Sequence, residues 1–334
     1  MAAARLGALK KISPGKNKPE QTIKMRNKIL RWIFNSFLKK RVDRYIDRKV
    51  NEILTRRFKY HYYTELWDAA IRKGETKVLK ELPEGLKFLC SSDSILDKMV
   101  FTNEFENDEI LFLNRFLKSG DRFIDIGANS GLFTIYAAKA VGDKGQVFAF
   151  EPTDTTYKKL CENIELNKFS NIVTYKLAIS SKNEDLDFYS LSEGFDAWNS
   201  LAKPIIKKKY TVVNVKTVQI DKFDEIGIDF NNSVLVKIDI EGWELKAIKG
   251  GVNCLKNENS PALMIEFADE HARNTGGSCR ELYAFLESLD YKLFKYDKVK
   301  NKLIHAPNQD YYYENIIATK KIDFVNERLR VEQS

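Results

Sequence analysis

Short runs of β-branched and aromatic residues alternate with amphipathic stretches from about residue 120 onward. The short runs predict strands, because each is bounded by residues that favour turns. The stretches between them repeat apolar residues every three to four positions, which is typical of helices that pack on a sheet. We expect strands at 122–126, 146–150, 172–178, 234–239, 262–266, 292–296 and 314–319, and helices at 131–140, 155–167, 243–255 and 279–289.

This alternation predicts an α/β fold. Five strands separated by four helices require a parallel sheet with helices on both faces, and the last two strands close it. Two further strand-like runs, at 186–190 and 210–220, interrupt the alternation. Upstream of the sheet, we expect helices at 64–72 and 108–117 and a turn that feeds a strand at 82–90.

The N-terminal part of the chain follows a different pattern. Residues 1–24 carry few large apolar side chains, so we expect a flexible basic tail. Residues 26–57 repeat apolar side chains at helical spacing opposite a lysine- and arginine-rich face. We therefore place a basic amphipathic helical extension at 25–80, before an α/β domain at 81–325. Three uses of the helix stay open: packing on the protein's own body, self-association into a homo-oligomer, and docking on an anionic membrane surface.

Composition and charge exclude several classes of protein. Of the 334 residues, 43% are apolar, which is enough for a large core and excludes a disordered or fibrous chain. Residues 1–60 hold 18 lysines and arginines against 4 acidic residues, whereas the remainder holds 37 against 43. A domain that acts on nucleic acid would be expected to carry the positive charge itself, so we expect no nucleic-acid partner.

The cysteines and the hydropathy pattern indicate the compartment. The four cysteines, at 90, 161, 254 and 279, share no metal-type spacing, and no segment resembles a secretory signal. No window approaches 18 uncharged apolar residues, so we expect no membrane span. We expect a cytoplasmic protein without a structural metal, and contact with the inner face of a membrane stays open.

A glycine turn follows the predicted strand at 122–126. The sequence Asp125-Ile-Gly-Ala-Asn-Ser-Gly131 places two glycines where strand passes into helix, so the backbone can turn sharply against a ligand. Asn129 stands where the second glycine of a dinucleotide-binding fingerprint would be. The turn therefore argues against a pyrophosphate ligand.

An acidic residue ends the next predicted strand. Glu151 lies 24 residues after Gly127 and is followed by Pro152, a position from which a carboxylate can accept hydrogen bonds from a ribose diol. Asp125 can in addition hold a cationic amino acid group or orient the amides of the turn. Together these features favour S-adenosylmethionine over NAD as the ligand. The alternative is that Asp125 merely caps the loop and that Glu151 is a surface acid.

These motifs resemble the FkbM-type family of S-adenosylmethionine-dependent O-methyltransferases. The resemblance covers about residues 86–320 and implies a class I methyltransferase (Rossmann-like) fold and methylation of a hydroxyl, commonly on a sugar or a secondary metabolite. Trp243 stands where the family often has a small residue. The resemblance rests on the glycine turn, Phe150-Glu-Pro152, Asn163-Ile-Glu-Leu-Asn167 and, above all, Val236-Lys-Ile-Asp-Ile-Glu-Gly-Trp-Glu-Leu-Lys246.

The resemblance also implies roles for individual residues. Asp239 and Glu241 would stand beside the sulfonium and the acceptor. Glu241 and Glu244 also fall in the first turn of the next helix, where the helix dipole favours acids, and this explains Glu244 better. The cofactor contacts implied are Asp125, Gly127, Ala128, Asn129, Gly131, Glu151, Pro152, Ala178, Ser180 and Asp239.

Methyl transfer to an alcohol also requires a base that removes the hydroxyl proton. We consider Asp239, Glu266 and His271, with Glu241 beside them, as the catalytic residues. His271 follows the strand at 262–266 and is expected in a loop above the acceptor, although a solvated loop histidine is the alternative. Asp239 with Glu266 could instead bind a divalent ion that acidifies the hydroxyl, which the sequence leaves open.

Residues 192–204 mix an aromatic side chain with hydrogen-bonding ones, a combination that suits sugars. We therefore predict an acceptor site formed by Trp198, Asn199 and Ser200 together with Trp243, with an ordinary connection around a buried tryptophan as the alternative. The sequence as a whole predicts an S-adenosylmethionine-dependent O-methyltransferase of a sugar or glycan. The alternatives are an O-methyltransferase of a polyketide or other small metabolite and a non-catalytic scaffold that binds the cofactor.

Overall fold

The computed structural model describes residues 57–191, 201 and 210–330, together with 45, 49–50 and 53–55. The chain divides into two compact units, residues 1–61 and 62–334. The described residues between 45 and 72 are helical, which confirms the helices predicted at 26–57 and 64–72 where they are described; residues 58–63, which were not predicted as helix, are helical as well. The predicted tail at 1–24 and most of the predicted extension lie outside the described residues.

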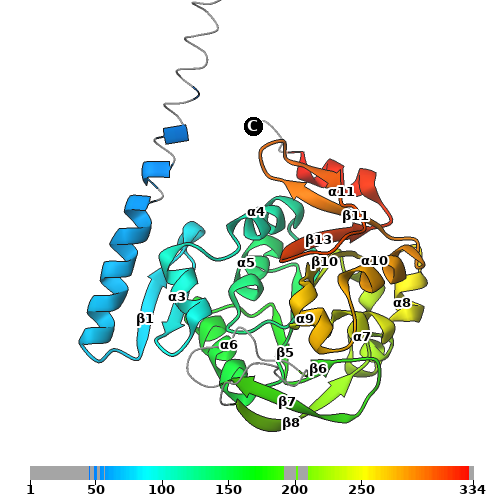
Figure 1. Cartoon of the computed structure of the whole chain (residues 1–334), viewed down its shortest axis with the longest axis horizontal. Helices are drawn as coiled ribbons and strands as arrows, with labels where there is room; N and C mark the ends of the chain where they lie inside the picture. The colour runs from blue at the N-terminus through cyan, green and yellow to red at the C-terminus, as the bar shows by residue number, and fades with distance from the viewer. Residues whose placement is uncertain are drawn as a thin grey trace, which may run out of the picture. The chain divides into compact units, whose positions relative to one another are not determined.

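A large mixed sheet organises the second unit (Figure 1). Its strand order is β12-β11-β13-β10-β9-β3-β4-β5, so the order reverses between β3 and β9, as expected of a class I methyltransferase. The parallel strands are β3 (Arg122–Ile126), β4 (Gln146–Phe150), β5 (Ile172–Tyr175), β9 (Leu235–Ile238) and β10 (Ala262–Phe267). The antiparallel strands are β11 (Lys292–Asp297), β12 (Lys302–His305) and β13 (Glu314–Thr319), of which β12 was not predicted.

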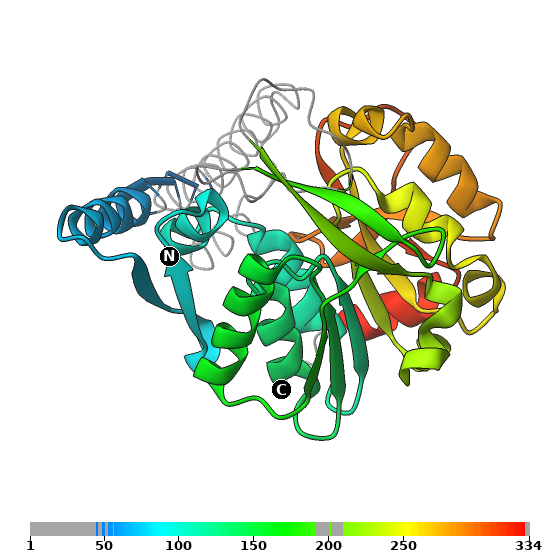
Figure 2. The same cartoon turned by 90° about the horizontal axis from the view of Figure 1, so that it is seen from below.

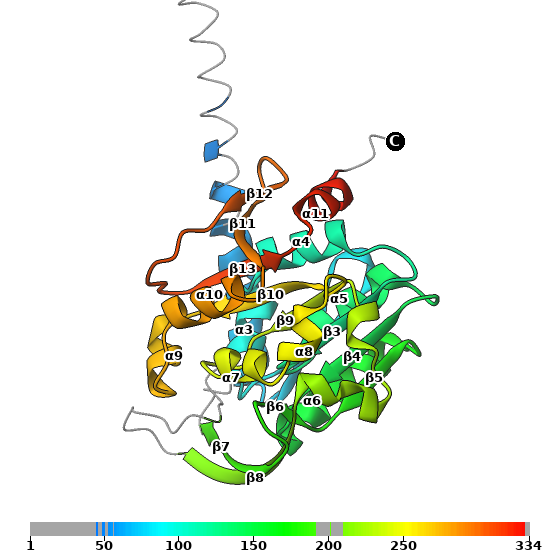
Figure 3. The ribbon, with the colours of Figure 1, turned by 90° about the vertical axis from the view of Figure 1, so that its right-hand side faces the viewer.

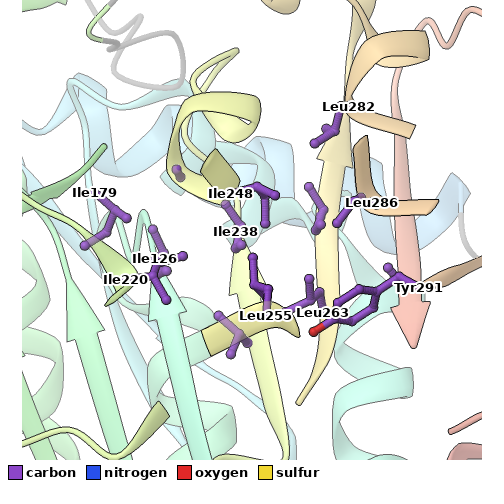
Figure 4. Close-up of a cluster of buried hydrophobic side chains, with 14 of the residues drawn as sticks. Ile126, Ile179, Ile220, Ile238, Ile248, Leu255, Leu263, Leu282, Leu286 and Tyr291 are labelled. Carbon is purple, nitrogen blue, oxygen red and sulfur yellow. The ribbon is translucent and has the colours of Figure 1, made fainter. Parts of the chain in front are cut away.

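Helices cover both faces of this sheet, as predicted. One face packs against α4 (Asn107–Phe116), α5 (Leu132–Val141) and α11 (Ile322–Leu329). The other packs against α7 (Glu244–Lys249), α8 (Val252–Lys256) and α10 (Cys279–Glu287). Figure 4 shows this second core, in which Ile238 of β9 lies beside Ile248 of α7, and Ile126 and Leu286 lie to either side of them. The sheet is therefore buried on both sides, which explains its apolar strands.

The prediction of one helix over 243–255 was wrong, because the helix breaks at Gly250 and Gly251. A Cβ at Gly250 would lie 2.2 Å from the Ser180 carbonyl oxygen, and one at Gly251 would lie 2.8 Å from Ile220 Cβ. The two glycines let the chain between α7 and α8 approach neighbouring segments closely.

Two smaller sheets flank the large one. β1 (Lys77–Glu81) and β2 (Lys87–Ser91) form an antiparallel pair. β6 (Ala178–Ile179), β8 (Tyr210–Val218) and β7 (Asp185–Leu191) form a second sheet, which confirms the two predicted strand-like runs. The predicted strand at 172–178 is divided, since β5 and β6 belong to different sheets. Figures 1 and 3 place the β7–β8 ribbon at the end of the unit away from β11, and Figure 2 looks onto it.

Three further α-helices are α3 (Ile95–Thr102), α6 (Asp154–Asn167) and α9 (Asp269–Asn274). α6 packs against β4 through Leu160 and Ala149. Within the described ranges, no helix has the length and apolarity needed to cross a bilayer.

Candidate active site

A cavity of about 490 Å³ opens at the carboxyl ends of β3, β4, β9 and β10. Open α/β sheets bind their ligands at this edge, where the strand order reverses. The turns that follow β3 and β9 line it, and α3, α9, β6 and the chain before β13 contribute further residues. The lining residues at or just after the strand ends include Ile126, Gly127, Glu151, Pro152, Asp239, Glu241 and Glu266.

The glycine turn is held tightly between two neighbouring strand ends. Gly127 has a φ of +84°, and a Cβ there would lie 1.9 Å from the Asp239 carbonyl oxygen. The backbone N–H groups of Gly127 and Ala128 both donate to the Phe150 carbonyl, at 3.0 and 2.9 Å. A residue with a side chain would therefore force apart the ends of β3 and β9.

Two buried side chains hold the turn from below. Asp97, on α3, accepts a hydrogen bond from the Ser130 hydroxyl at 2.8 Å. Asn163, on α6, donates to the Ser130 carbonyl at 2.9 Å and accepts from the Leu89 N–H at 2.7 Å. Sequence analysis missed Asp97 and gave Asn163 no role, because these contacts join segments that are distant in sequence.

Asp125 leaves one carboxylate oxygen for a ligand. Its Oδ2 accepts a hydrogen bond from Thr134 Oγ1 at 2.6 Å, whereas its Oδ1 is buried without a hydrogen-bond partner among the described residues. Burial raises the pKa of Asp125, and Lys237 opposes the shift. Because Asp125 lines the cavity, an ammonium group bound there would satisfy the remaining oxygen.

Glu151 is buried, which rules out the alternative that it is a surface acid. The residue is 7% exposed and lies at the cavity wall. It accepts hydrogen bonds from the Thr153 hydroxyl at 2.9 Å and from the Asn129 N–H at 3.2 Å. Burial raises its pKa to about 7. The carboxylate is positioned to accept further hydrogen bonds from ligand hydroxyls.

The cavity brings together most of the predicted cofactor residues. Gly131 and Ser180 are not among the residues that line it. Gly131 precedes α5, and a Cβ there would lie 2.7 Å from Leu160 Cδ1. The Ser180 hydroxyl accepts a hydrogen bond from Trp243 Nε1 at 3.1 Å and so positions that ring. The predicted cofactor residues in the lining are Asp125, Gly127, Ala128, Asn129, Glu151, Pro152, Ala178 and Asp239.

The four predicted catalytic residues also line this cavity. His271 Nδ1 lies 2.7 Å from Glu241 Oε2 and 3.4 Å from Glu266 Oε2. Burial alone would lower the pKa of His271, but its hydrogen bonds to the two carboxylates and their charges raise it to about 11. The expectation of a loop around His271 was wrong, since the residue lies on α9. A Cβ at Gly242 would lie 2.3 Å from the His271 carbonyl oxygen, so the turn after β9 packs directly on α9.

The same three groups are close enough to hold a metal ion. Glu241, Glu266 and His271 each offer one ligand atom, and these three atoms lie within 4.8 Å of one another. Asp239, which the sequence paired with Glu266 for this purpose, instead accepts a hydrogen bond from Lys237 Nζ at 2.6 Å.

Lys237 and Glu106, to which the sequence analysis gave no role, and Tyr313, which it missed, also line the cavity. Lys237 is 3% exposed and lies inside an otherwise apolar strand, which was the signal that could have revealed it. Burial would lower its pKa, but the surrounding carboxylates, chiefly Asp239, raise it above its usual range. Tyr313 donates a hydrogen bond to Glu106 Oε1.

The acceptor residues predicted from residues 192–204 can be located only in part. Trp198, Asn199 and Ser200 lie outside the described residues. Trp243 lines the cavity. Glu244 is buried and accepts hydrogen bonds from the Ile240 and Gly242 N–H groups, at 2.9 and 3.2 Å. This arrangement agrees with the structural role expected for Glu244.

Comparison with known proteins identifies relatives of the domain that holds this cavity. A family profile described as the methyltransferase FkbM domain matches residues 125–293. The hexuronic acid methyltransferase AglP of Haloferax volcanii is 29% identical over 154 residues, which are 46% of this chain and 59% of AglP. The ribosomal protein L11 methyltransferase of Syntrophomonas wolfei is 38% identical over 66 residues, which are 20% of this chain and 21% of that protein. The chain thus spans less than two thirds of these relatives.

Solved structures show weaker similarity. TYW2 of M. jannaschii in complex with AdoMet has a TM-score of 0.37 and 18% identity, and the match covers 73% of this chain and 84% of TYW2. A SAM-dependent O-methyltransferase from Thermotoga maritima also has a TM-score of 0.37, with 16% identity over 73% of this chain and 77% of that protein. The strand order of the large sheet is itself that of a class I methyltransferase.

Proposed function

The chain belongs to the FkbM methyltransferase family and is an S-adenosylmethionine-dependent methyltransferase, and from this premise we propose that it methylates a hydroxyl group of a sugar or glycan. The observation that carries the proposal is the arrangement of one cavity, in which Asp125 and Glu151 line one wall and Asp239, Glu266 and His271 another. The first wall suits the methyl donor, and the second suits a hydroxyl that must lose a proton.

The first wall fits the donor in its chemistry. When bound, S-adenosylmethionine supplies an electrophilic methyl group. The unpartnered Oδ1 of Asp125 can accept a hydrogen bond from the donor's ammonium group, and Glu151 can accept from the ribose hydroxyls. Gly127 keeps the turn between them free of a side chain, so the backbone can lie against the ligand.

The second wall offers acceptors for the hydroxyl proton. The raised pKa of His271 makes the imidazole a cation near neutral pH, so we assign it the role of binding Glu241 and Glu266 together. We assign proton removal to Asp239, whose carboxylate is oriented by its hydrogen bond from Lys237. A base placed in this way typically contributes about 10² to 10⁴-fold to the rate.

A sugar acceptor is supported by the mixture of side chains and by one relative. Trp243 and Tyr313 line the cavity beside the carboxylates, and aromatic faces cover the C–H surface of sugars while carboxylates bind their hydroxyls. AglP, at 29% identity, carries the name of a hexuronic acid methyltransferase. Both observations favour a sugar over a polyketide.

The test is methylation by the purified full-length chain with labelled S-adenosylmethionine. Neutral glycosides and oligosaccharides are compared with polyketide-type alcohols, and we expect label in a base-stable sugar ether. Replacing Asp239 by asparagine should lower kcat by about 100-fold or more and change cofactor affinity by less than about ten-fold. The matched control is the exposed Asp143→Asn variant, which should retain activity. Label in polyketide-type alcohols alone, or cofactor binding without turnover, would contradict the proposal.

A further inference from the structure

The part of the cavity beyond the glycine turn is rich in carboxylates. They come from the chain before α4, from the turn after β9, from β10 and from α9. The residues are Glu104, Glu106, Asp239, Glu241, Glu266 and Glu270.

Two basic residues, Lys237 and His271, are the cations among the described residues of this lining. Lys237 donates to Asp239 Oδ2 at 2.6 Å, and the His271 imidazole lies between Glu241 and Glu266. Each positive charge is therefore already engaged by carboxylates of the protein. An anionic ligand would have to compete with those carboxylates for the same cations.

Negative charge is costly in this wall even without a ligand. Burial raises the pKa of Glu106 to about 7; Lys237 opposes the shift and the charge of Asp239 adds to it. This carboxyl group holds its proton more tightly than an exposed one does. A further anion placed beside it would meet the same low-dielectric surroundings and the same like charges.

Resting on the methyltransferase activity proposed above, we infer that the acceptor is an uncharged polyhydroxyl compound and that uronates and sugar phosphates are rejected. Hydroxyl groups suit this wall because they both donate to carboxylates and accept from protonated carboxyl groups. The inference separates this chain from AglP, whose name specifies a hexuronic acid. The inferred discrimination acts through charge rather than size. A uronamide tests this, because its amide group has a shape similar to that of the uronate's carboxylate.

The experiment compares three forms of the sugar that the acceptor screen identifies: the neutral sugar, its uronate, and the uronamide, which keeps the shape of the uronate without its charge. We expect kcat/KM for the uronate to be roughly 100-fold below that for the uronamide, since two like charges about 4 Å apart in a protein interact by more than a factor of 100. The neutral sugar and the uronamide should differ much less. A 6-phosphate of the sugar should be rejected like the uronate.

A double variant tests whether the cavity's charge is the cause. Glu104 and Glu270 are the exposed members of this carboxylate-rich lining. Replacing both by glutamine should raise kcat/KM for the uronate several-fold relative to kcat/KM for the uronamide, because the two substrates differ only in the charge of one group. The matched control is Glu165→Gln with Glu287→Gln, which removes two exposed carboxylates that do not line the cavity, and it should change neither value.

Three outcomes would overturn the inference. The first is equal or preferred use of the uronate. The second is use of the uronate that is lost when Lys203 and the lysines at 207–209 are all replaced by glutamine. These lysines lie outside the described residues. The third is use of the uronate only with added Mn²⁺, lost in Glu266→Gln, which would show that the wall holds a cation. Cofactor binding by calorimetry without methylation of any acceptor would instead contradict the proposed function.

Discussion

Replacing Glu151 by glutamine separates the cost of burying this carboxylate from its use in binding. The residue is 7% exposed, and burial raises its pKa from 4.5 to about 7. Because the pKa is higher in the folded chain than in the unfolded chain, the folded state binds the proton more tightly. The stabilising effect is therefore fully present below about pH 4.5 and is lost as the pH rises through 7.

The magnitude follows from the size of the shift. A rise from 4.5 to about 7 corresponds to roughly 3 kcal/mol in the free energy of unfolding, most of which disappears between pH 5 and pH 9. Glutamine cannot ionise, so the variant lacks this loss. In wild type, Glu151 accepts hydrogen bonds from the hydroxyl and the N–H of Thr153 and from the N–H of Asn129. The NH₂ group of glutamine is itself a donor, so it would face one of these donors without an acceptor. That penalty, about 1 to 3 kcal/mol, is the same at every pH.

The observable is therefore the difference in pH dependence rather than the stability at one pH. Urea denaturation of the cofactor-free protein from pH 5 to pH 9 should show wild type losing about 2 to 3 kcal/mol relative to Glu151→Gln. The exposed Glu165→Gln variant serves as the control and should parallel wild type. At pH 8 the Glu151→Gln variant should also bind S-adenosylmethionine at least about ten-fold more weakly, because a charged acceptor of the ribose hydroxyls is lost. Parallel pH profiles for wild type and Glu151→Gln would refute the reasoning.

Three further substitutions test the walls of the cavity by urea denaturation. Gly127→Ala should lower the free energy of unfolding by about 2 kcal/mol more than Gly120→Ala, because both glycines have positive φ but only at Gly127 would the new Cβ clash. Equal losses would contradict the close approach to Asp239. Asn163→Ala should cost about 2 to 4 kcal/mol and weaken cofactor binding, since the Ser130 carbonyl and the Leu89 N–H lose their partner; unchanged binding would show that the turn does not depend on it. Lys237→Met should lower the free energy of unfolding by about 3 to 5 kcal/mol, because it leaves buried carboxylates without a counter-charge. A loss below about 1 kcal/mol would mean that those carboxylates are protonated.

The large sheet was predictable because its strands are strongly apolar and its turns are marked. β3, β4 and β13 begin and end where the pattern places them. β12 escaped prediction because its four residues, Lys302–His305, include exposed and polar positions and pair only at the sheet edge. α9 escaped because its polar sequence lacks an apolar stripe, and its place is fixed by packing on the Gly242 turn.

The site was predictable wherever a side chain lies at a strand end. Asp125, Glu151 and Asp239 follow directly from the strand pattern, since parallel strands end at a common edge. Asp97 and Glu106 were not predictable in this way. Both come from segments before the large sheet: Asp97 holds the glycine turn through Ser130, and Glu106 lines the cavity and accepts a hydrogen bond from Tyr313. No local pattern reports these tertiary contacts.

The register of the two central strands explains why a lysine occupies a buried strand. β3 and β9 pair in parallel with Asp125 opposite Lys237, and the alternation of side chains along a strand places Lys237 and Asp239 on the same face. The ammonium therefore lies between two carboxylates, one on each strand, and near the Phe133 ring at 4.6 Å. A shift of β9 by one residue against β3 would turn Lys237 and Asp239 toward the apolar face of the sheet opposite to that of Asp125. The cluster of Asp125, Lys237 and Asp239 thus disfavours a wrong register between β3 and β9. The observed register also brings Asp125, the proposed donor-binding residue, beside the proposed base Asp239.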